Sequence, residues 1–490
     1  MNHNNKIWQV FFIIVFVEIL FLILSFYKDE TKIFSKVGLN FYSFSELVDF
    51  TVAHTNTKAD SLIDKYIGKN KNKMLSRRQI LTCGQNKKNI FLENPHDNNN
   101  NYALDYFFDA LINQSDTCIV RIAHYGDSQL EGDRITSILR KKFQKKFGGS
   151  GVGYIPFTDI ASPILYSRET TGNWCRFNVF NNKYPSGLYG IAGVVFKFNN
   201  CKQTFKKDSD TLSNFNDTTY IRWLTSTKSG IIIKLFSQIN YNKISVMYGN
   251  STLPCFVKIN DKNKSVNFND TLPPVKTFCI HNFNLGNYPD YFKIEFESAK
   301  SPDFYGLLLD ANNGVQIDNY AIRGHSGTGL LDINQDYLAK QLKILNTKLI
   351  IFQYGGNLVP YVHDSIGYKQ LEKIYYLLFI KFKQAVPDAS ILVVSTGDMA
   401  RKKGDKYVSY PQIYQIVEAQ RRAALKAGCA FWDLYATMGG EGSINSWTSK
   451  RLSSPEGHFS PKGQQIIADE LFNTIMIEYN SYKLRKHKLL

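Results

Sequence analysis

The chain has 490 residues, a formal net charge of +17 and a hydrophobic content of 43%. This length exceeds that of one typical domain and is enough for two or three. The charge would suit nucleic acid, an anionic membrane surface or an anionic polymer. The sequence contains no zinc-finger, helix-turn-helix or RNP-like pattern, which argues against the common nucleic-acid-binding classes.

An apolar run at the N-terminus extends over residues 7–26 and is interrupted by only three polar residues, one of which is Glu18. Twenty helical residues rise about 30 Å, the thickness of a bilayer's hydrocarbon core. The run is longer than the apolar part of a typical signal peptide, and no small-x-small cleavage site follows it. We therefore expect residues 1–29 to be an uncleaved membrane anchor, with Glu18 either neutral or in contact with a partner's membrane helix.

The polar, Asn- and Lys-rich segment 30–100 predicts a spacer outside the membrane. The apolar run 119–124 then predicts a buried strand, and an amphipathic pattern over 130–146 predicts a helix. Between about 160 and 310 the sequence changes to short alternating segments separated by Asn, Asp, Gly and Lys. This pattern predicts an antiparallel β-sandwich. Its clearest strands are expected at 192–198, 230–236, 243–248 and 291–297.

After residue 314, predicted strands alternate with predicted helices. The strands are expected at 314–322, 348–353, 390–395 and 430–434, and the helices at 334–345, 367–385 and 410–427. This alternation predicts a mostly parallel sheet with helices on both faces. We therefore expect one α/β domain, residues 101–159 and 311–480, with the sandwich, residues 160–310, inserted between its first and second strands.

The seven cysteines include four between residues 175 and 279, and none forms a CxxC pair. A thiolate zinc site is therefore not expected. Outside the cytosol, these four cysteines could form one or two disulfides. The odd count leaves at least one free thiol, and the spacing does not determine the connectivity.

Four short motifs of the α/β domain lie in loops next to its predicted strands and helices. In parallel sheets, ligands bind in such loops beyond the carboxyl ends of the strands. The first motif is Gly-Asp-Ser, which ends at Ser128, and the second contains Gly324. Asn357 follows the next strand, and His458 precedes a helix that begins with Ser-Pro. Each motif alone fits a helix cap, a plain turn or a structural histidine. Together, a serine, oxyanion donors and a general base indicate acyl transfer.

The order of these motifs resembles the SGNH (GDSL-type) hydrolases over about 100–155 and 314–475. The resemblance implies a flavodoxin-like three-layer α/β fold and no cofactor. It further implies that Ser128 is the nucleophile and His458 the base. The main-chain N–H groups of Ser128 and Gly324 and the side chain of Asn357 would form the oxyanion hole. More narrowly, the chain resembles bacterial peptidoglycan or polysaccharide O-acetylesterases, which carry a carbohydrate-binding-like module at the same place.

One position departs from the family pattern, which has Asp three residues before the histidine. This chain has Pro455 there. Glu456 lies one residue closer to His458, and Asp398 and Asp433 end neighbouring predicted strands. We expect Glu456 to be the third catalytic residue, with a Ser-His dyad or one of the two aspartates as alternatives.

These observations predict a serine esterase that removes O-acetyl groups from a cell-envelope polysaccharide such as peptidoglycan. It would be anchored in the inner membrane with its body in the periplasm. The first alternative is an O-acetyltransferase of the same fold, working with a membrane-bound acetyl-delivering partner. The second is a glycan-binding protein without activity. No nucleic acid is expected as a partner.

Overall fold

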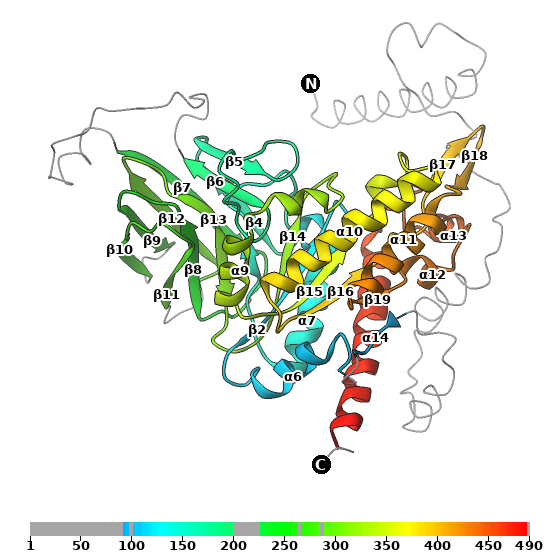
Figure 1. The fold of residues 1–490 in the computed structure, drawn as a ribbon. Coiled ribbons are helices and arrows are strands. Elements are labelled where there is room, and N and C mark those ends of the chain that lie inside the picture. Colours follow the sequence, from blue (N-terminus) through cyan, green and yellow to red (C-terminus); the bar gives the residue numbers. More distant parts are fainter. Residues whose placement is uncertain (1–91, 98–100, 199–225, 263–265, 285–288, 488–490) are drawn as a thin grey trace, which may run out of the picture. The chain divides into compact units, whose positions relative to one another are not determined.

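The computed structural model describes residues 92–97, 101–198, 226–262, 266–284 and 289–487 (Figure 1). The expected membrane anchor at 1–29 lies outside the described residues, as does nearly all of the expected spacer. Within the described part of the chain, no helix is both long and apolar enough to cross a membrane.

A six-stranded sheet forms the centre of the α/β part, in the order β1-β19-β16-β15-β2-β14. The five strands from β19 to β14 pair with one another in parallel. The edge strand β1 pairs with β19 in the antiparallel direction. The strands are β1 (Leu92–Glu93), β2 (Ile119–Gly126), β14 (Gly314–Ala321), β15 (Thr347–Gln353), β16 (Ser390–Val394) and β19 (Ala430–Trp432). Because β1 pairs with β19, the sheet begins inside the segment that was expected to be a spacer.

Helices cover both faces of this sheet, as Figure 1 shows. They are α6 (Asp105–Asn113), α7 (Arg134–Phe147), α9 (Gln335–Ile344), α10 (Ser365–Ala385), α11 (Ile413–Lys426), α12 (Leu434–Met438), α13 (Ser443–Ser449) and α14 (Pro461–His487). Alternate residues of β2 show why two layers form: Val120 and Ile122 pack with α6, α7 and α14, whereas Ala123 and Tyr125 pack with α9, α10 and α11.

The expected helix at 130–146 is interrupted near its start. Residues Glu131–Asp133 form a short 3-10 turn, η2, and α7 begins only at Arg134. Gly132 and Asp133 have φ values of 71° and 68°, which lie in the left-handed region. An α-helix cannot continue through two left-handed residues, so the loop after Ser128 is longer than the periodicity predicts.

Two antiparallel sheets form the part of the chain between β2 and β14. One has the order β10-β9-β12-β7-β4 and the other β11-β8-β13-β6-β5, with β3 paired to β13. The strands are β3 (Gly153–Ile155), β4 (Tyr166–Thr170), β5 (Trp174–Asn178), β6 (Val194–Phe198), β7 (Thr227–Leu235), β8 (Lys243–Gly249), β9 (Cys255–Asp261), β10 (Asn267–Leu272), β11 (Cys279–Asn284), β12 (Tyr291–Ser298) and β13 (Asp303–Asp310). Phe296 of the first sheet lies 4.8 Å from Phe304 of the second, ring centre to ring centre. The chain thus has an α/β domain with an inserted antiparallel β domain.

Arg121 of β2 links the two parts through a buried ionic cluster. Its guanidinium donates to Asp318 in β14 at 2.9 and 3.0 Å and to Asp310 at the end of β13 at 2.6 Å. Asp318 also accepts from the main-chain N–H of Tyr154 in β3, at 3.0 Å. The strand that enters the inserted domain and the strand that leaves it are therefore both tied to the central sheet.

The described cysteines differ in state. Cys175 in β5 is disulfide-bonded. Four others are free thiols, namely Cys118, Cys255, Cys279 and Cys429. Cys255 and Cys279, both in the group of four that could have formed disulfides, are therefore not bonded.

Candidate active site

Ser128 lies in a tight turn directly after β2, at the carboxyl end of the parallel sheet. The turn is closed by the N–H of Gln129, which donates to Asp127 Oδ1 at 3.0 Å, and by the N–H of Leu130, which donates to the Asp127 carbonyl at 3.1 Å. The turn requires glycine at position 126, because a Cβ there would lie only 2.6 Å from the Leu130 side chain. The sequence thus places a serine hydroxyl at the sheet edge where ligands bind.

His458 reaches Ser128 from a loop 330 residues further along the chain. The distance between Ser128 Oγ and His458 Nε2 is 2.9 Å. The N–H of Ser454 donates to the His458 carbonyl at 2.9 Å, and the N–H of Ala400 donates to the Pro455 carbonyl at 2.7 Å. The loop that carries the imidazole is therefore fixed through its main chain.

Gln129 adds a contact that the sequence pattern did not indicate. Its side-chain Nε2 donates to the carbonyl of Gly457 at 2.6 Å. Gly457 has a φ of +87°, a left-handed conformation that favours glycine. Residues next to Ser128 and next to His458 are thus bonded to each other, and only the tertiary structure brings them together.

The expected third residue, Glu456, is exposed and makes no hydrogen bond with His458 in the structure. Among the described residues, no carboxylate bonds to this histidine. Asp398 accepts instead from Ser409 Oγ at 2.9 Å and from the Ile444 N–H at 3.0 Å. Asp433 caps α12 by accepting from the Ala436 N–H at 2.8 Å. Asp398 and Asp433, the two alternatives for the third catalytic residue, therefore hydrogen-bond to groups other than His458.

Asn357 lies in η4 (Gly356–Leu358), just beyond the carboxyl end of β15. Ser128 likewise follows the carboxyl end of β2, the neighbouring strand. Its Nδ2 donates to Asp127 Oδ2 at 2.9 Å and to the His325 carbonyl at 3.2 Å. Burial raises the pKa of Asp127 to about 6, and the Gln129 and Asn357 hydrogen bonds oppose that rise. The Asn357 amide is thus held next to the serine turn by the aspartate that precedes the serine.

Gly324 follows β14, on the other side of β2 from Asn357. It has a φ of +74°, and a Cβ there would touch only the Phe180 ring, at 3.4 Å. Its neighbour Arg323 makes a bidentate bond with the buried Glu131, with distances of 2.7–2.9 Å. This ion pair joins the Gly324 loop to the loop that follows Ser128.

A cavity of about 200 Å³ opens beside Ser128 and His458. It is lined by residues of the Ser128 turn and the His458 loop, of the β15 and β16 ends and of the loop after η4, including Asn357, Tyr361, Asp398 and Glu456. Gly324 is not among its lining residues. The structure thus brings Ser128, His458 and Asn357 into one cavity, whose lining does not include Gly324.

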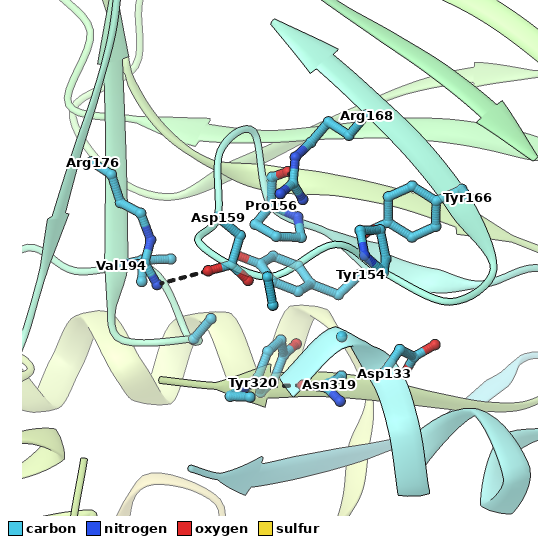
Figure 2. Close-up of a pocket in the computed structure, with 15 residues that line it drawn as sticks. Asp133, Tyr154, Pro156, Asp159, Tyr166, Arg168, Arg176, Val194, Asn319 and Tyr320 are labelled. Carbon is cyan, nitrogen blue, oxygen red and sulfur yellow. Dashed lines mark hydrogen bonds and ion pairs between the residues drawn. The ribbon is translucent and has the colours of Figure 1, made fainter. Parts of the chain in front are cut away.

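A second cavity, of about 40 Å³, lies between the β14 end and strands β4 to β6 (Figure 2). Arg176 and Asp159 form an ion pair there with an N–O distance of 3.6 Å. Neither Ser128 nor His458 lines it. Within the described residues, no group of three or more His, Cys, Asp or Glu side chains is placed to hold a metal ion.

No protein-family model and no curated protein sequence matches the chain. A solved structure of a peptidoglycan O-acetylesterase is similar, with a TM-score of 0.61 and 16% sequence identity, over 80% of this chain and 99% of that one. An acetyl xylan esterase (TM-score 0.27, 15% identity, 33% of this chain and 81% of that one) and a family 29 carbohydrate-binding module (0.20, 8%, 34% and 89%) are too distant to indicate a shared fold. The chain therefore shares the fold of the first of these proteins.

Proposed function

We propose that this chain is a serine esterase that removes O-acetyl groups from a cell-envelope polysaccharide such as peptidoglycan. The observation that carries the proposal is the 2.9 Å contact between Ser128 Oγ and His458 Nε2 at the carboxyl edge of the parallel sheet. A hydroxyl in hydrogen-bond contact with an imidazole is the arrangement of an activated nucleophile. The fold shared with a peptidoglycan O-acetylesterase adds support for this class of ester.

In the proposed reaction, Ser128 Oγ attacks the acetyl carbonyl carbon while His458 Nε2 takes the hydroxyl proton. The Ser128 N–H, the Gly324 N–H and the Asn357 amide stabilise the oxyanion. The bond to the sugar oxygen then breaks, and His458 returns the proton to that oxygen. Water, deprotonated by His458, attacks the acetyl-enzyme, which releases acetate and restores Ser128.

The Asn357 amide already makes two hydrogen bonds in the free enzyme, to Asp127 and to the His325 carbonyl. The bond to His325 is the longer of the two. In this mechanism Asn357 keeps its bond to Asp127 and turns its second N–H from the His325 carbonyl to the oxyanion. The aspartate of the Gly-Asp-Ser motif thus orients the amide.

The inserted β domain is proposed to hold the polymer. A groove of about 440 Å³ crosses its five-stranded sheet. The groove has an aromatic ring, Phe256, among polar and charged side chains from β7, β9, β10 and β12. A ring among polar groups suits a sugar chain, which presents both apolar faces and hydroxyls.

The apolar run 7–26 supports anchoring of the body at the periplasmic side of the inner membrane. Carbonate extraction of membranes tests this part: an anchored chain stays in the pellet. Recovery of the chain in the soluble fraction, starting after residue 28, would mean that the run is a cleaved signal.

Acetate release from O-acetylated peptidoglycan tests the function. Wild type and Ser481→Ala, which changes a serine on α14, should release acetate, whereas Ser128→Ala and His458→Ala should lose at least a thousandfold in kcat. A serine-directed probe should label wild type and not Ser128→Ala. Activity that persists in Ser128→Ala refutes the proposal. Transfer of the acetyl group to an added glycan acceptor, in place of acetate release, would identify an O-acetyltransferase.

A further inference from the structure

The cavity beside Ser128 has room for more than an acetyl group. Its volume is about 200 Å³, whereas a cavity that just admits one water has about 10–15 Å³ by a comparable measure. An acetyl group has only three heavy atoms. The cavity therefore has room for part of the sugar that carries the ester, and its lining would select which sugars fit.

The charge of the lining is opposite in sign to that of the whole chain. Asp127, Asp398 and Glu456 line the cavity, and its lining includes no Lys or Arg. Burial raises the pKa of both aspartates to about 6, so at pH 7.5 most of each is still ionised. A carboxylate on the bound sugar would meet like charges in a partly enclosed site, which costs several kcal/mol in comparable interfaces.

Tyr361 supplies the apolar surface of the same cavity. It has the largest exposed fraction, 79%, among the large exposed hydrophobic side chains of the described residues, and it lines the cavity. Its backbone is fixed, because its N–H donates to the Leu358 carbonyl at 2.9 Å and Val359, two residues before it, is fully buried. An exposed ring on a fixed backbone, lining a cavity, is a ready platform for the apolar face of a ligand.

We infer that this cavity binds an uncharged sugar ring, with the C–H face of the pyranose on Tyr361, and rejects uronates. The inference rests on the proposed esterase function and specifies its substrate class. The net positive charge of the chain does not contradict it, because the three carboxyl groups line the cavity and no Lys or Arg does.

Two matched substrates test the charge preference in the full-length protein. We compare an O-acetylated neutral oligosaccharide with an O-acetylated uronate oligosaccharide of equal length and acetyl content, and with 4-nitrophenyl acetate. The expected kcat/KM for the neutral sugar is at least thirtyfold higher than for the uronate at low salt. The ratio should fall as ionic strength rises, because salt screens the repulsion. An equal or higher kcat/KM for the uronate overturns the inference.

Variants of Tyr361 test the platform. In Tyr361→Ala the ratio of kcat/KM for the neutral oligosaccharide to that for 4-nitrophenyl acetate should fall about tenfold, mainly through KM. Tyr361→Phe keeps the ring and should stay within threefold of wild type, as should Tyr106→Ala, which removes another exposed tyrosine, on α6. A ratio that Tyr361→Ala leaves within twofold overturns the inference. If no substrate gives Ser128-dependent hydrolysis, the proposed function itself has failed, and the inference with it.

Discussion

Gln129 and Gly457 are joined by a 2.6 Å hydrogen bond from the side-chain amide nitrogen to the main-chain oxygen. Gln129 follows Ser128, and Gly457 precedes His458. The bond therefore couples the turn that carries Ser128 directly to the loop that carries His458. In the proposed mechanism this bond helps to hold the loop of His458, a histidine to which no described carboxylate bonds.

Gln129 is thus expected to be a positioning residue. Gln129→Ala should lower kcat on a small acetyl ester about tenfold, because the loop that positions His458 loses a hydrogen bond. KM should stay within twofold of wild type, because most of the cavity lining is unchanged. Gln129→Glu should be at least as slow, since a carboxylate cannot donate to the Gly457 carbonyl. Steady-state kinetics together with the thermal midpoint check this. A normal kcat in Gln129→Ala, or a loss explained by unfolding, contradicts it.

Glu456→Gln separates a triad from a dyad. Glu456 is exposed and makes no hydrogen bond with His458, so we expect kcat on 4-nitrophenyl acetate to fall less than about threefold. A drop of about a hundredfold in a folded variant would instead assign Glu456 the role of a triad acid. Asp433→Asn serves as the companion variant, because Asp433 caps α12 and is expected to affect stability more than kcat.

The cluster around Arg121 should govern the stability of the α/β domain. Asp318→Ala leaves the buried Arg121 guanidinium with only Asp310 as a charged partner. Removing one member of a buried ion pair costs about 3–5 kcal/mol in the free energy of unfolding. Urea denaturation measures this change. Arg422→Ala, which breaks the exposed pair with Glu372, should cost about 0–1 kcal/mol. Equal effects of the two variants would show that the cluster does not hold the domain.

Asp398 should make stability depend on pH. Burial raises its pKa to about 6, above the value of about 4 in an unfolded chain. Between these values the native state binds more protons than the unfolded state. Its contribution to the free energy of unfolding therefore falls as pH rises from 4 to 6 and stays low above that. The Asp398→Asn variant lacks this titration. Relative to wild type it should gain about 2 kcal/mol of stability between pH 4.5 and pH 8. Parallel pH profiles would show that the pKa of Asp398 is not raised.

The sequence alone indicated that the motifs of Ser128 and Asn357 lie at one sheet edge, because it revealed the alternation of strands and helices. The carboxyl ends of parallel strands meet at one edge, so polar residues after 119–124 and 348–353 had to lie near each other. The Ser-Pro start of the final helix likewise placed His458 just outside it: the Gly463 N–H bonds to Ser460 Oγ, and α14 begins at Pro461. These features are local, and local patterns determine them.

The tertiary structure alone decided the contacts between segments that are distant in the chain. Periodicity did not show that η2 breaks the helix after Ser128, because the left-handed backbone at Asp133 leaves no hydrophobic signature. Nor did it show that Gln129 bonds Gly457 or that Asp127 orients Asn357. A hydrogen bond depends on a few tenths of an ångström and on direction. Only the packing of the whole domain fixes such geometry, so the sequence could name Ser128 and His458 but not how His458 is held.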